Sequence, residues 1–464
     1  MRIGIHWFRR DLRLEDNTAL IELSRHVEKI IPVYIVSNWT GAHPWTGSKR
    51  QNFLCSCLED LDTQLRRKGG RLICRTGSAP TVLNSLIEEN NITHISFNHD
   101  YDPHGIYEEL EINRLANQHG IIALSCKNRV MHEADEVLTK AKKPFTVFTP
   151  YGKVWSQIAK PKKQLVLPEK FHIIRSEELP RSATWGFPYD QQILKGGSTE
   201  AEKRLATFIS SGLENYHACR NTLAHTNSQL SQDLRFGIIS IRKVYQAVTE
   251  AKETLPAESQ AHIQTYINEL AWREFYMALL VNRPDVLNSE FDKKFKGMEW
   301  DNTSNSVEKF EKWCQGLTGF PVIDAAMREL NATGLMHNRA RMLTAMFLTK
   351  DLHIDWRKGE RWFMQQLIDG EIASNNGGWQ WSAGTGADAA PYFRIQNPWL
   401  QTKRYDRDGE YIKRWVPELC DIQPKLFWNP PEERLSINYP QPIVTHSVEK
   451  EETLTRYRRC LGKP

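Results

Sequence analysis

Apolar and polar positions alternate in two rhythms along the first 125 residues of the chain. Short runs of β-branched and other apolar residues predict five strands, at residues 2–7, 30–36, 71–75, 92–97 and 121–125. Between these runs apolar residues recur every three or four positions, which predicts helices such as residues 50–65 and one that begins near Asn17. Strands that alternate with helices predict a parallel sheet covered on both faces, so residues 1–130 are expected to form a Rossmann-like α/β domain.

The rest of the chain follows a different pattern. Residues 131–197 are rich in proline, lysine and aromatic residues and have no clear period, which predicts an interdomain linker. Residues 198–464 are expected to form an all-α domain, because nearly every segment has helical periodicity. The clearest helical segments cover residues 199–213, 267–281, 320–333 and 337–352.

The turn after the first predicted strand reads "FRRDLRLEDN" and lacks the G-x-G-x-x-G pattern. In dinucleotide-binding α/β domains those glycines let the backbone approach a pyrophosphate. The sequence therefore argues against a nicotinamide-dependent dehydrogenase.

Composition is typical of a soluble globular protein. Of the 464 residues, 40% are hydrophobic and 25% are charged, and no run approaches the roughly 18 apolar residues that a membrane span needs. The N-terminus has no hydrophobic block ahead of a small-residue cleavage site, so a cytoplasmic location is expected. The eight cysteines form no C-x-x-C pair and no H-E-x-x-H motif occurs, so no catalytic metal is expected.

Net charge decides little, because a value of +5 fits most soluble proteins. One segment, residues 137–168, contains lysines but no acidic residue. Its lysines are Lys140, Lys142, Lys143, Lys153, Lys160, Lys162 and Lys163. A solvated linker surface is the favoured interpretation of this segment.

The helix predicted at residues 267–281 carries a polar stripe. Glu269, Trp272, Arg273 and Tyr276 are spaced i, i+3, i+4 and i+7, so an acid, an indole, a guanidinium and a phenol share one helix face. Such a face is too polar for an ordinary core.

A second face of mixed chemistry is predicted in residues 337–352. Asn338, Arg341, Met342 and Ala345 repeat the same spacing and place an amide, a cation and a thioether together. Either helix alone would be interpreted as an ordinary amphipathic helix with a methionine filler. Two such faces in one domain favour a binding site.

The segment "IDGEIASNNGGWQW" concentrates polar groups beside glycines. Asp369 and Glu371 flank Gly370 and precede Asn375. Carboxylates can accept from ring N–H groups or pair with Arg341, and an amide can both donate and accept. These carboxylates and the amide together suit the binding of a heteroaromatic cofactor. Each of the 15 tryptophans is first expected to be a core anchor, with base stacking and electron transfer as alternatives.

Another candidate segment is "NYHACRNTLAHTNSQLSQDLRFGIIS". Tyr216 and Arg220 are spaced to share a helix face. Asn227, Ser228 and Ser231 precede an apolar helix, a capping pattern that also suits a phosphate.

Together these segments resemble the photolyase and cryptochrome flavoproteins. The matching motifs are "HWFRRDLRLEDNTAL", "TNSQLSQDLRFGIIS", "NELAWREFYMAL", "TGFPVIDAAMRELNATGLMHNRARM" and "IDWRKGERWFMQQLIDGEIASNNGGWQW", in chain order. The resemblance covers nearly the whole chain and is strongest to class I cyclobutane pyrimidine dimer photolyases. It implies a deoxyribodipyrimidine photo-lyase in which photoexcited reduced FAD gives an electron to a flipped-out dimer; photolyases are themselves among the enzymes from which base flipping is known.

The resemblance also assigns residues to the cofactor and the substrate. It implies FAD binding by Tyr216, Asn227, Ser228, Gln229, Leu230, Ser231, Tyr266, Arg341, Asp369, Gly370 and Glu371. Asn375 would contact the flavin nitrogen whose protonation sets the radical state. Glu269, Asn338 and Met342 would contact the dimer. The implied DNA-binding residues are Arg220, Trp272, Arg273, Tyr276, Arg339 and Trp381.

Electron transfer to the flavin is assigned by the same resemblance to Trp379, Trp356 and Trp300. The implied partner of this monomer is UV-damaged DNA, single- or double-stranded. Gly105 stands where folate-antenna members carry Glu, so a second antenna chromophore is left open in identity and in presence.

The chain departs from the family's usual residues at several positions. Asn227-Ser228 and Ser231-Gln232 replace the common Thr-Ser and Ser-Pro, Asn221 replaces an Asp, and Leu335 replaces a Trp. Three alternatives stay open at this stage. They are a six-four photoproduct photolyase, a blue-light signalling cryptochrome and, apart from the resemblance, a nucleotide-dependent α/β enzyme.

Overall fold

The structure is a computed structural model that describes residues 1–164, 168–225, 227–253, 255–256, 259–429 and 439–462. Residues 165–167 of the expected linker and Thr226, which opens "TNSQLSQDLRFGIIS", lie outside the described residues, as do 254, 257–258, 430–438 and 463–464. The chain divides into two compact units. Unit 1 comprises Met1–Asn215 and Ser228–Pro284, and unit 2 comprises Tyr216–Asn227 and Asp285–Pro464. The domain limits at residues 130 and 197 stay predictions.

Unit 1 contains a five-stranded sheet in which every neighbouring pair is parallel. Its strands, in the spatial order β3-β2-β1-β4-β5, are β1 (Ile3–Phe8), β2 (Lys29–Val36), β3 (Ile73–Thr76), β4 (Ile92–Asn98) and β5 (Ile122–Cys126). In register, Ile5 of β1 lies opposite Ile31 of β2 and Ile95 of β4, and all three are fully buried. The predicted strands and the Rossmann-like class of this region are confirmed.

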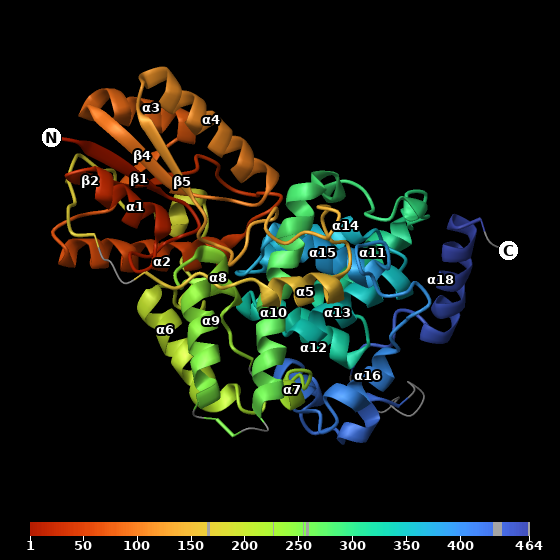
Figure 1. Cartoon of the computed structure of the whole chain (residues 1–464). Coiled ribbons are helices and arrows are strands. Elements are labelled where there is room, and N and C mark those ends of the chain that lie inside the picture. The colour runs from red at the N-terminus through yellow and green to blue at the C-terminus, as the bar shows by residue number, and fades with distance from the viewer. Residues whose placement is uncertain (165–167, 226, 254, 257–258, 430–438, 463–464) are drawn as a thin grey trace. The chain divides into compact units, whose positions relative to one another are not determined.

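Helices cover both faces of this sheet, as Figure 1 shows, with α3 and α4 along one face and α1 and α2 along the other. Their bounds are α1 (Thr18–His26), α2 (Ser48–Arg67), α3 (Ala79–Asn90) and α4 (Pro103–His119). Leu83, Leu86 and Ile112 of α3 and α4 share a buried core with the strands. α1 begins where the sequence predicted, because the side chain of Asn17 caps it by accepting from the Leu20 backbone N–H.

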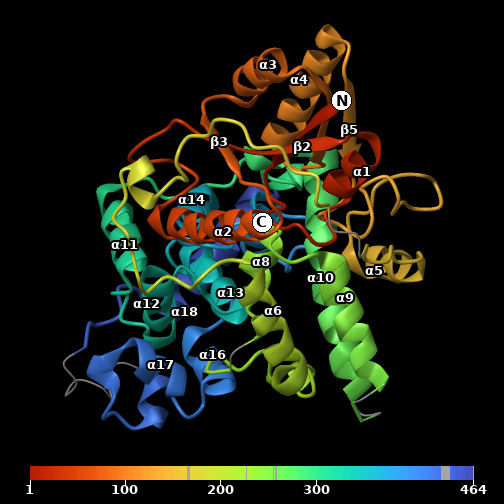
Figure 2. The same ribbon diagram turned by 90° about the vertical axis from the view of Figure 1, so that its left-hand side faces the viewer.

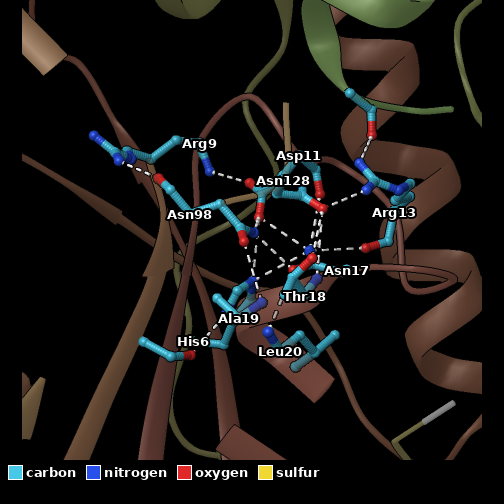
Figure 3. A network of polar contacts seen from close by, with 12 residues as sticks. His6, Arg9, Asp11, Arg13, Asn17, Thr18, Ala19, Leu20, Asn98 and Asn128 are labelled. Atoms are coloured by element: carbon cyan, nitrogen blue, oxygen red, sulfur yellow. Dashed lines mark hydrogen bonds and ion pairs between the residues drawn. The ribbon is translucent and has the colours of Figure 1, made fainter. Parts of the chain in front are cut away.

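Polar side chains, and not glycines, organise the turn after β1 (Figure 3). Asn98, the last residue of β4, donates from Nδ2 to Asp11 at 2.6 Å and to Asn17 at 2.7 Å, and the Arg9 backbone N–H donates to Asp11 at 2.8 Å. Burial raises the pKa of Asp11, but the His6 side chain and these donors outweigh burial and hold the pKa below its usual range. The carboxyl ends of β1 and β4, where the strand order reverses, are therefore held by buried hydrogen bonds.

The expected linker is not structureless. It contains α5 (Phe148–Gln157) and the 3-10 helix η1 (Ser182–Trp185), and single β-bridges pair Ile30 with Phe171 and Cys74 with Glu177. The remaining elements of unit 1 are α6 (Ser198–Thr207), η2 (Phe208–Gly212), α8 (Ser231–Phe236), α9 (Ile241–Glu250), η3 (Ala251–Glu253) and α10 (Gln260–Asn282).

Unit 2 is helical, as the sequence predicted. Its longer helices are α11 (Ser304–Gln315), α12 (Pro321–Thr333), α13 (Asn338–Met346), α14 (Trp356–Gln366), α15 (Ile372–Ala383), α16 (Pro398–Tyr405) and α18 (His446–Cys460). Shorter elements are α7 (Tyr216–Cys219), η6 (Lys293–Phe295), η7 (Phe347–Asp351), α17 (Glu410–Trp415), η8 (Pro417–Leu419) and η9 (Pro424–Phe427), and η5 (Pro284–Leu287) begins at the last residue of unit 1.

Two predicted helices end differently from a regular α-helix. The segments predicted at 199–213 and 337–352 finish in the π-helical turns η2 and η7, in which Leu213 and Leu352 donate to the carbonyl five residues earlier. Periodicity cannot distinguish such a turn, because one inserted residue shifts the pattern only locally. Within the described ranges, no helix is long and apolar enough to cross a membrane.

Candidate functional site

The polar stripe predicted on α10 exists. Glu269, Trp272, Arg273 and Tyr276 are all half-buried, whereas the intervening Phe275 is fully buried. The Trp272 and Tyr276 rings lie 5.6 Å apart between centroids. One face of α10 thus presents an acid beside two aromatic rings.

Neighbouring segments of unit 1 hold this helix in place. Arg273 donates to the Arg129 carbonyl at 2.8 Å, and the fully buried Glu274 accepts from the Trp155 indole N–H at 2.6 Å. Burial raises the pKa of Glu274 to about 7, against the lowering effect of its hydrogen bonds. Sequence patterns did not reveal Glu274, because its partners come from the expected linker.

The loop at residues 227–231 differs from its predicted role. Helix α8 begins at Ser231 after Leu230, and no side chain of the described residues caps it, so the predicted capping pattern is wrong. Gln229 adopts a left-handed conformation with φ of +50°, which turns the chain before the helix. Ser228 instead hydrogen-bonds the buried phenol of Tyr266, whose pKa is raised by burial. Two residues assigned to the cofactor are therefore in direct contact.

In unit 2, the predicted pairing of Arg341 is confirmed. Arg341 of α13 donates from Nη2 to Oδ2 of Asp369 at 2.8 Å and from Nε to the Met336 carbonyl at 2.9 Å. The other carboxylate oxygen of Asp369, Oδ1, is buried and accepts no hydrogen bond from any residue that the structure describes.

Asn338 and Met342 lie on the accessible side of α13, Asn338 exposed and Met342 half-buried. Arg339 donates to Oδ1 of Asn221 at 2.6 Å and to the Met342 sulfur at 3.4 Å. Its guanidinium also lies 4.8 Å from the centroid of the Tyr405 ring. Asn221, which replaces an Asp of the family, thus still orients this arginine.

Tyr216 begins the short helix α7, and Arg220 directly follows the last residue of that helix. The Arg220 guanidinium lies 6.0 Å from the centroid of the Tyr216 ring, as the i, i+4 spacing predicted.

Helix α15 separates its residues into a buried and an accessible face. Asn375, Gly378 and Trp381 are half-buried, whereas Asn376 and Trp379 are buried. A Cβ added at Gly378 would meet no atom within 4 Å, so space lies beside this face.

Glu360, a buried residue that the sequence did not reveal, orients the asparagine pair through its backbone carbonyl and its carboxyl. Asn375 donates from Nδ2 to the backbone carbonyl of Glu360 at 3.1 Å, and Asn376 donates to the Glu360 carboxyl at 3.1 Å. Burial raises the pKa of Glu360 to about 8, although the bond from Asn376 lowers it. The side-chain oxygen of Asn375 accepts no hydrogen bond from the described part of the chain.

The tryptophans assigned to electron transfer belong to the core of unit 2. Trp379 and Trp356 are buried, and Trp300 is half-buried against the same core. The Trp379 ring lies 6.1 Å from that of Trp313, and a Cβ added at Gly359 would meet the Trp379 ring at 2.1 Å. Gly359 is therefore required for α14 to pack on α15. No group of three or more potential metal ligands occurs among the residues described, and the absence of a metal stays a prediction.

Two family models match the chain. Residues 4–169 match DNA photolyase, and residues 266–459 match the FAD binding domain of DNA photolyase. The deoxyribodipyrimidine photo-lyase of Agrobacterium fabrum is 35% identical over 476 residues, which cover 98% of this chain and 97% of the relative.

Solved structures give the same result. A class III photolyase from Agrobacterium tumefaciens superposes with a TM-score of 0.91 at 33% identity, over 100% of this chain and 98% of its own. An archaeal photolyase from Sulfolobus tokodaii with two FAD molecules superposes with a TM-score of 0.86 at 30% identity, over 98% of this chain and 100% of its own. A cryptochrome from Synechocystis superposes with a TM-score of 0.88 at 28% identity, over 98% of this chain and 99% of its own.

Fold, site and similarity together define a flavin-binding protein of the photolyase type. The chain belongs to the DNA photolyase family. Membership of class I stays a prediction, since the matched Agrobacterium tumefaciens structure is of class III.

The residues present fit FAD. The buried Oδ1 of Asp369 is an acceptor to which no described residue donates, and a buried acceptor left in that state costs about 1–3 kcal/mol. The side-chain oxygen of the half-buried Asn375 also accepts from no described residue. The isoalloxazine ring and the ribityl chain carry N–H and O–H donors for such positions. The space beside Gly378 suits a flat ring system.

Proposed function

We propose that this protein is a light-dependent DNA repair enzyme, a deoxyribodipyrimidine photo-lyase that splits cyclobutane pyrimidine dimers. Its family membership and the FAD binding domain support this function. The observation that carries the proposal is the accessible face of α10, where Glu269 lies one helical turn from Trp272 and two turns from Tyr276. Bound FAD, once reduced, would supply a photoexcited electron for the splitting of the dimer.

The chain's own residues bind and position the substrate. Glu269 hydrogen-bonds the dimer and stabilises the negative charge that develops on it, because a charged hydrogen bond is stronger than a neutral one. Trp272 supplies an aromatic face on which a flipped base stacks. Asn338 and Met342, on the accessible side of α13, supply an amide donor and a polarisable apolar contact.

Other assigned residues contact the DNA backbone or the bases beside the dimer. Arg220, Arg273 and Arg339 are proposed to bind phosphates, which gives salt-dependent binding without sequence preference. Tyr276 and Trp381 are proposed to pack against bases. In the structure Arg273 and Arg339 also donate to groups within their own units, which positions their guanidinium planes.

FAD is proposed to bind the residues that the resemblance assigns to it. Ser228 with Tyr266 in unit 1, and Arg341 with Asp369 in unit 2, supply the directly observed contacts among the assigned residues. The same resemblance assigns Tyr216, Asn227, Gln229, Leu230, Ser231, Gly370 and Glu371 to the cofactor. Asn375 would contact the flavin through its side-chain oxygen. Trp379, Trp356 and Trp300 are proposed as the electron path to it.

Residue chemistry favours this reaction over its rivals within the family. Six-four photolyases typically have a pair of histidines in the region of Asn338 and Met342, and plant cryptochromes typically have Asp where Asn375 stands. A cytoplasmic monomer and the division at residues 130 and 197 are parts of the same proposal, which leaves the presence and the identity of a second antenna chromophore open.

Chemically reduced protein, mixed with single-stranded DNA that contains thymine dimers, tests this function. Thymine absorbance should recover under blue light and stay constant in darkness. No recovery, with FAD bound and reduced, would refute the proposal, and the same assay on six-four lesions would then identify the alternative enzyme.

A further inference from the structure

A short hairpin in unit 1 presents a concentrated positive charge. Residues 138–144, here called the lysine hairpin, are closed by a β-bridge between Leu138 and Pro144. Inside it, Thr139 donates to the Lys143 carbonyl at 2.9 Å and Lys142 donates to the Thr139 carbonyl at 2.8 Å. Lys142 has a left-handed φ of +55°, as a tight turn requires. The hairpin is therefore an ordered turn that is held together by its own backbone hydrogen bonds.

The lysines of the lysine hairpin have no acidic partner among the residues that the structure describes. Lys140, Lys142 and Lys143 are exposed, and none of them forms an ion pair with any residue that the structure describes. By contrast, Lys127 is paired with Glu136 at 2.6 Å, and Lys243 is paired with Glu202 and Glu15. Residues 137–168 contain no acid, and the acids directly before them do not pair with these lysines among the described residues, since Glu136 is paired with Lys127 and Glu133 with His99. The hairpin itself therefore carries a net positive charge.

The hairpin leads directly into the helix that supports the stripe on α10. Phe148, the first residue of α5, stacks on Trp272 with ring centroids 3.8 Å apart and an interplanar angle of 10°. Figures 1 and 2 both draw α5 alongside α10. Phe148 therefore covers one face of the Trp272 ring and fixes its orientation.

Distance along the chain limits how far the hairpin can lie from Trp272. Lys143 and Phe148 are five positions apart in the sequence, and a fully extended chain spans at most about 3.6 Å per residue. The Cα atom of Lys143 thus lies within about 18 Å of the Cα atom of Phe148, whose ring stacks on Trp272. That span corresponds to about five nucleotides at 3.4 Å each.

We propose that the lysine hairpin binds phosphates of the damaged DNA strand, a few nucleotides from the dimer that Trp272 contacts. This inference rests on the proposed function, because it takes Trp272 as a contact of the dimer. The partner is the phosphodiester backbone. The hairpin therefore contributes affinity for any sequence and little discrimination between damaged and undamaged strands.

The test compares binding of single-stranded DNA with one thymine dimer to the FAD-loaded protein in darkness, across a salt series. A triple variant replaces the three lysines of the hairpin by glutamine (Lys140→Gln, Lys142→Gln and Lys143→Gln). The control is a second triple variant that loses three exposed charges elsewhere in unit 1, Arg67→Gln, Lys203→Gln and Lys252→Gln. Each lost phosphate contact should lower the slope of log affinity against log salt by about 0.7, or about 2 for three contacts. At 0.1 M salt the affinity should fall on the order of 10- to 100-fold, for dimer-containing and undamaged strands alike.

A Lys→Arg triple variant should bind as the parent does, and repair by the Gln variant at saturating DNA should be unchanged. An unchanged salt slope in the Gln variant, or an equal loss in the control, overturns the proposal. Selective loss of dimer binding, or loss of repair at saturation, would also overturn it and make the hairpin a support of the Trp272 face. Failure of the parent to repair dimers would refute the proposed function, and the salt series would still report phosphate binding separately.

Discussion

The side-chain amide of Asn375 donates to the backbone carbonyl of Glu360 at 3.1 Å, which joins α15 to α14 at the residue assigned to the flavin. The bond fixes which end of the amide faces the protein. The nitrogen is occupied by Glu360, so the side-chain oxygen is the end left for a donor from the ligand. Glu360 is thus a positioning residue for Asn375.

Replacing Asn375 by Asp should change the redox behaviour of the bound flavin. A carboxylate cannot donate to the Glu360 carbonyl, and it adds a negative charge at the face where the cofactor is proposed to lie. We expect FAD to stay bound, the stability to fall by about 1 kcal/mol and the spectra during stepwise photochemical reduction to change. Asn113→Asp is a matched control, since Asn113 donates to the Glu109 carbonyl at 2.9 Å in unit 1. Reduction spectra identical to the parent's would remove Asn375 from its assigned contact.

Asp369→Asn should weaken FAD binding. The substitution removes the charge that Arg341 faces at 2.8 Å and makes the buried oxygen a poorer acceptor. Hydrogen bonds to charged groups contribute about 1.5–3 kcal/mol, so we expect a loss of affinity of about 10- to 100-fold, measured by flavin fluorescence on release. Glu418→Gln, which breaks the more exposed pair with Arg328 at 2.8 Å, should leave FAD affinity unchanged. Equal affinity of Asp369→Asn and the parent would exclude this carboxylate from the cofactor site.

Local patterns predicted those features that depend on neighbours in sequence. The strands, the stripe on α10 and the accessible face of α13 follow from periods of two and 3.6 residues, which a chain displays without knowledge of its partners. Glu274 and Glu360 could not be found in this way. Glu274 accepts from Trp155, 119 positions away, and from the Met131 backbone N–H, whereas the Glu360 carboxyl accepts from Asn376 of another helix. The wrong capping assignment at Ser231 has a similar cause, because Ser228 bonds Tyr266 of another helix.

Trp379→Phe should block photoreduction of the flavin and spare repair by chemically reduced protein. Phenylalanine keeps an aromatic ring against Phe363, 5.0 Å away, but it is much harder to oxidise than tryptophan. The measurement is the rate of flavin reduction under blue light with an added thiol, together with the repair yield after dithionite. Trp362→Phe is the control, since its indole nitrogen is also buried without a partner among the described residues. Normal photoreduction in Trp379→Phe would show that the electron follows another route.

Glu269→Gln should lower the repair yield while FAD stays bound. The amide keeps the size of the side chain on the accessible face of α10 but loses its charge, which reduces the strength of any hydrogen bond to the dimer. We expect a fall of up to about 10-fold in repair per absorbed photon, with binding of dimer-containing DNA less affected. Glu253→Gln, at an exposed position of η3, should behave as the parent. A repair yield equal to the parent's would mean that Glu269 takes no part in the reaction.

Glu360→Gln should flatten the dependence of stability on pH. Burial raises the pKa of Glu360 to about 8 in the folded protein, above its ordinary value of 4.5. A raised pKa means that the folded state holds the proton more tightly, so its contribution is fully present below about pH 4.5 and is lost as pH rises through 8. Over that window this group lowers the free energy of unfolding by up to about 1.4 kcal/mol per pH unit. Glutamine can still accept from Asn376 and has no proton to lose. Urea unfolding at pH 6 to 9 should therefore show that Glu360→Gln gains stability over the parent as pH rises. The control, Glu410→Gln at an exposed position, should follow a curve of stability against pH parallel to that of the parent. A parallel curve for Glu360→Gln would contradict the raised pKa of Glu360.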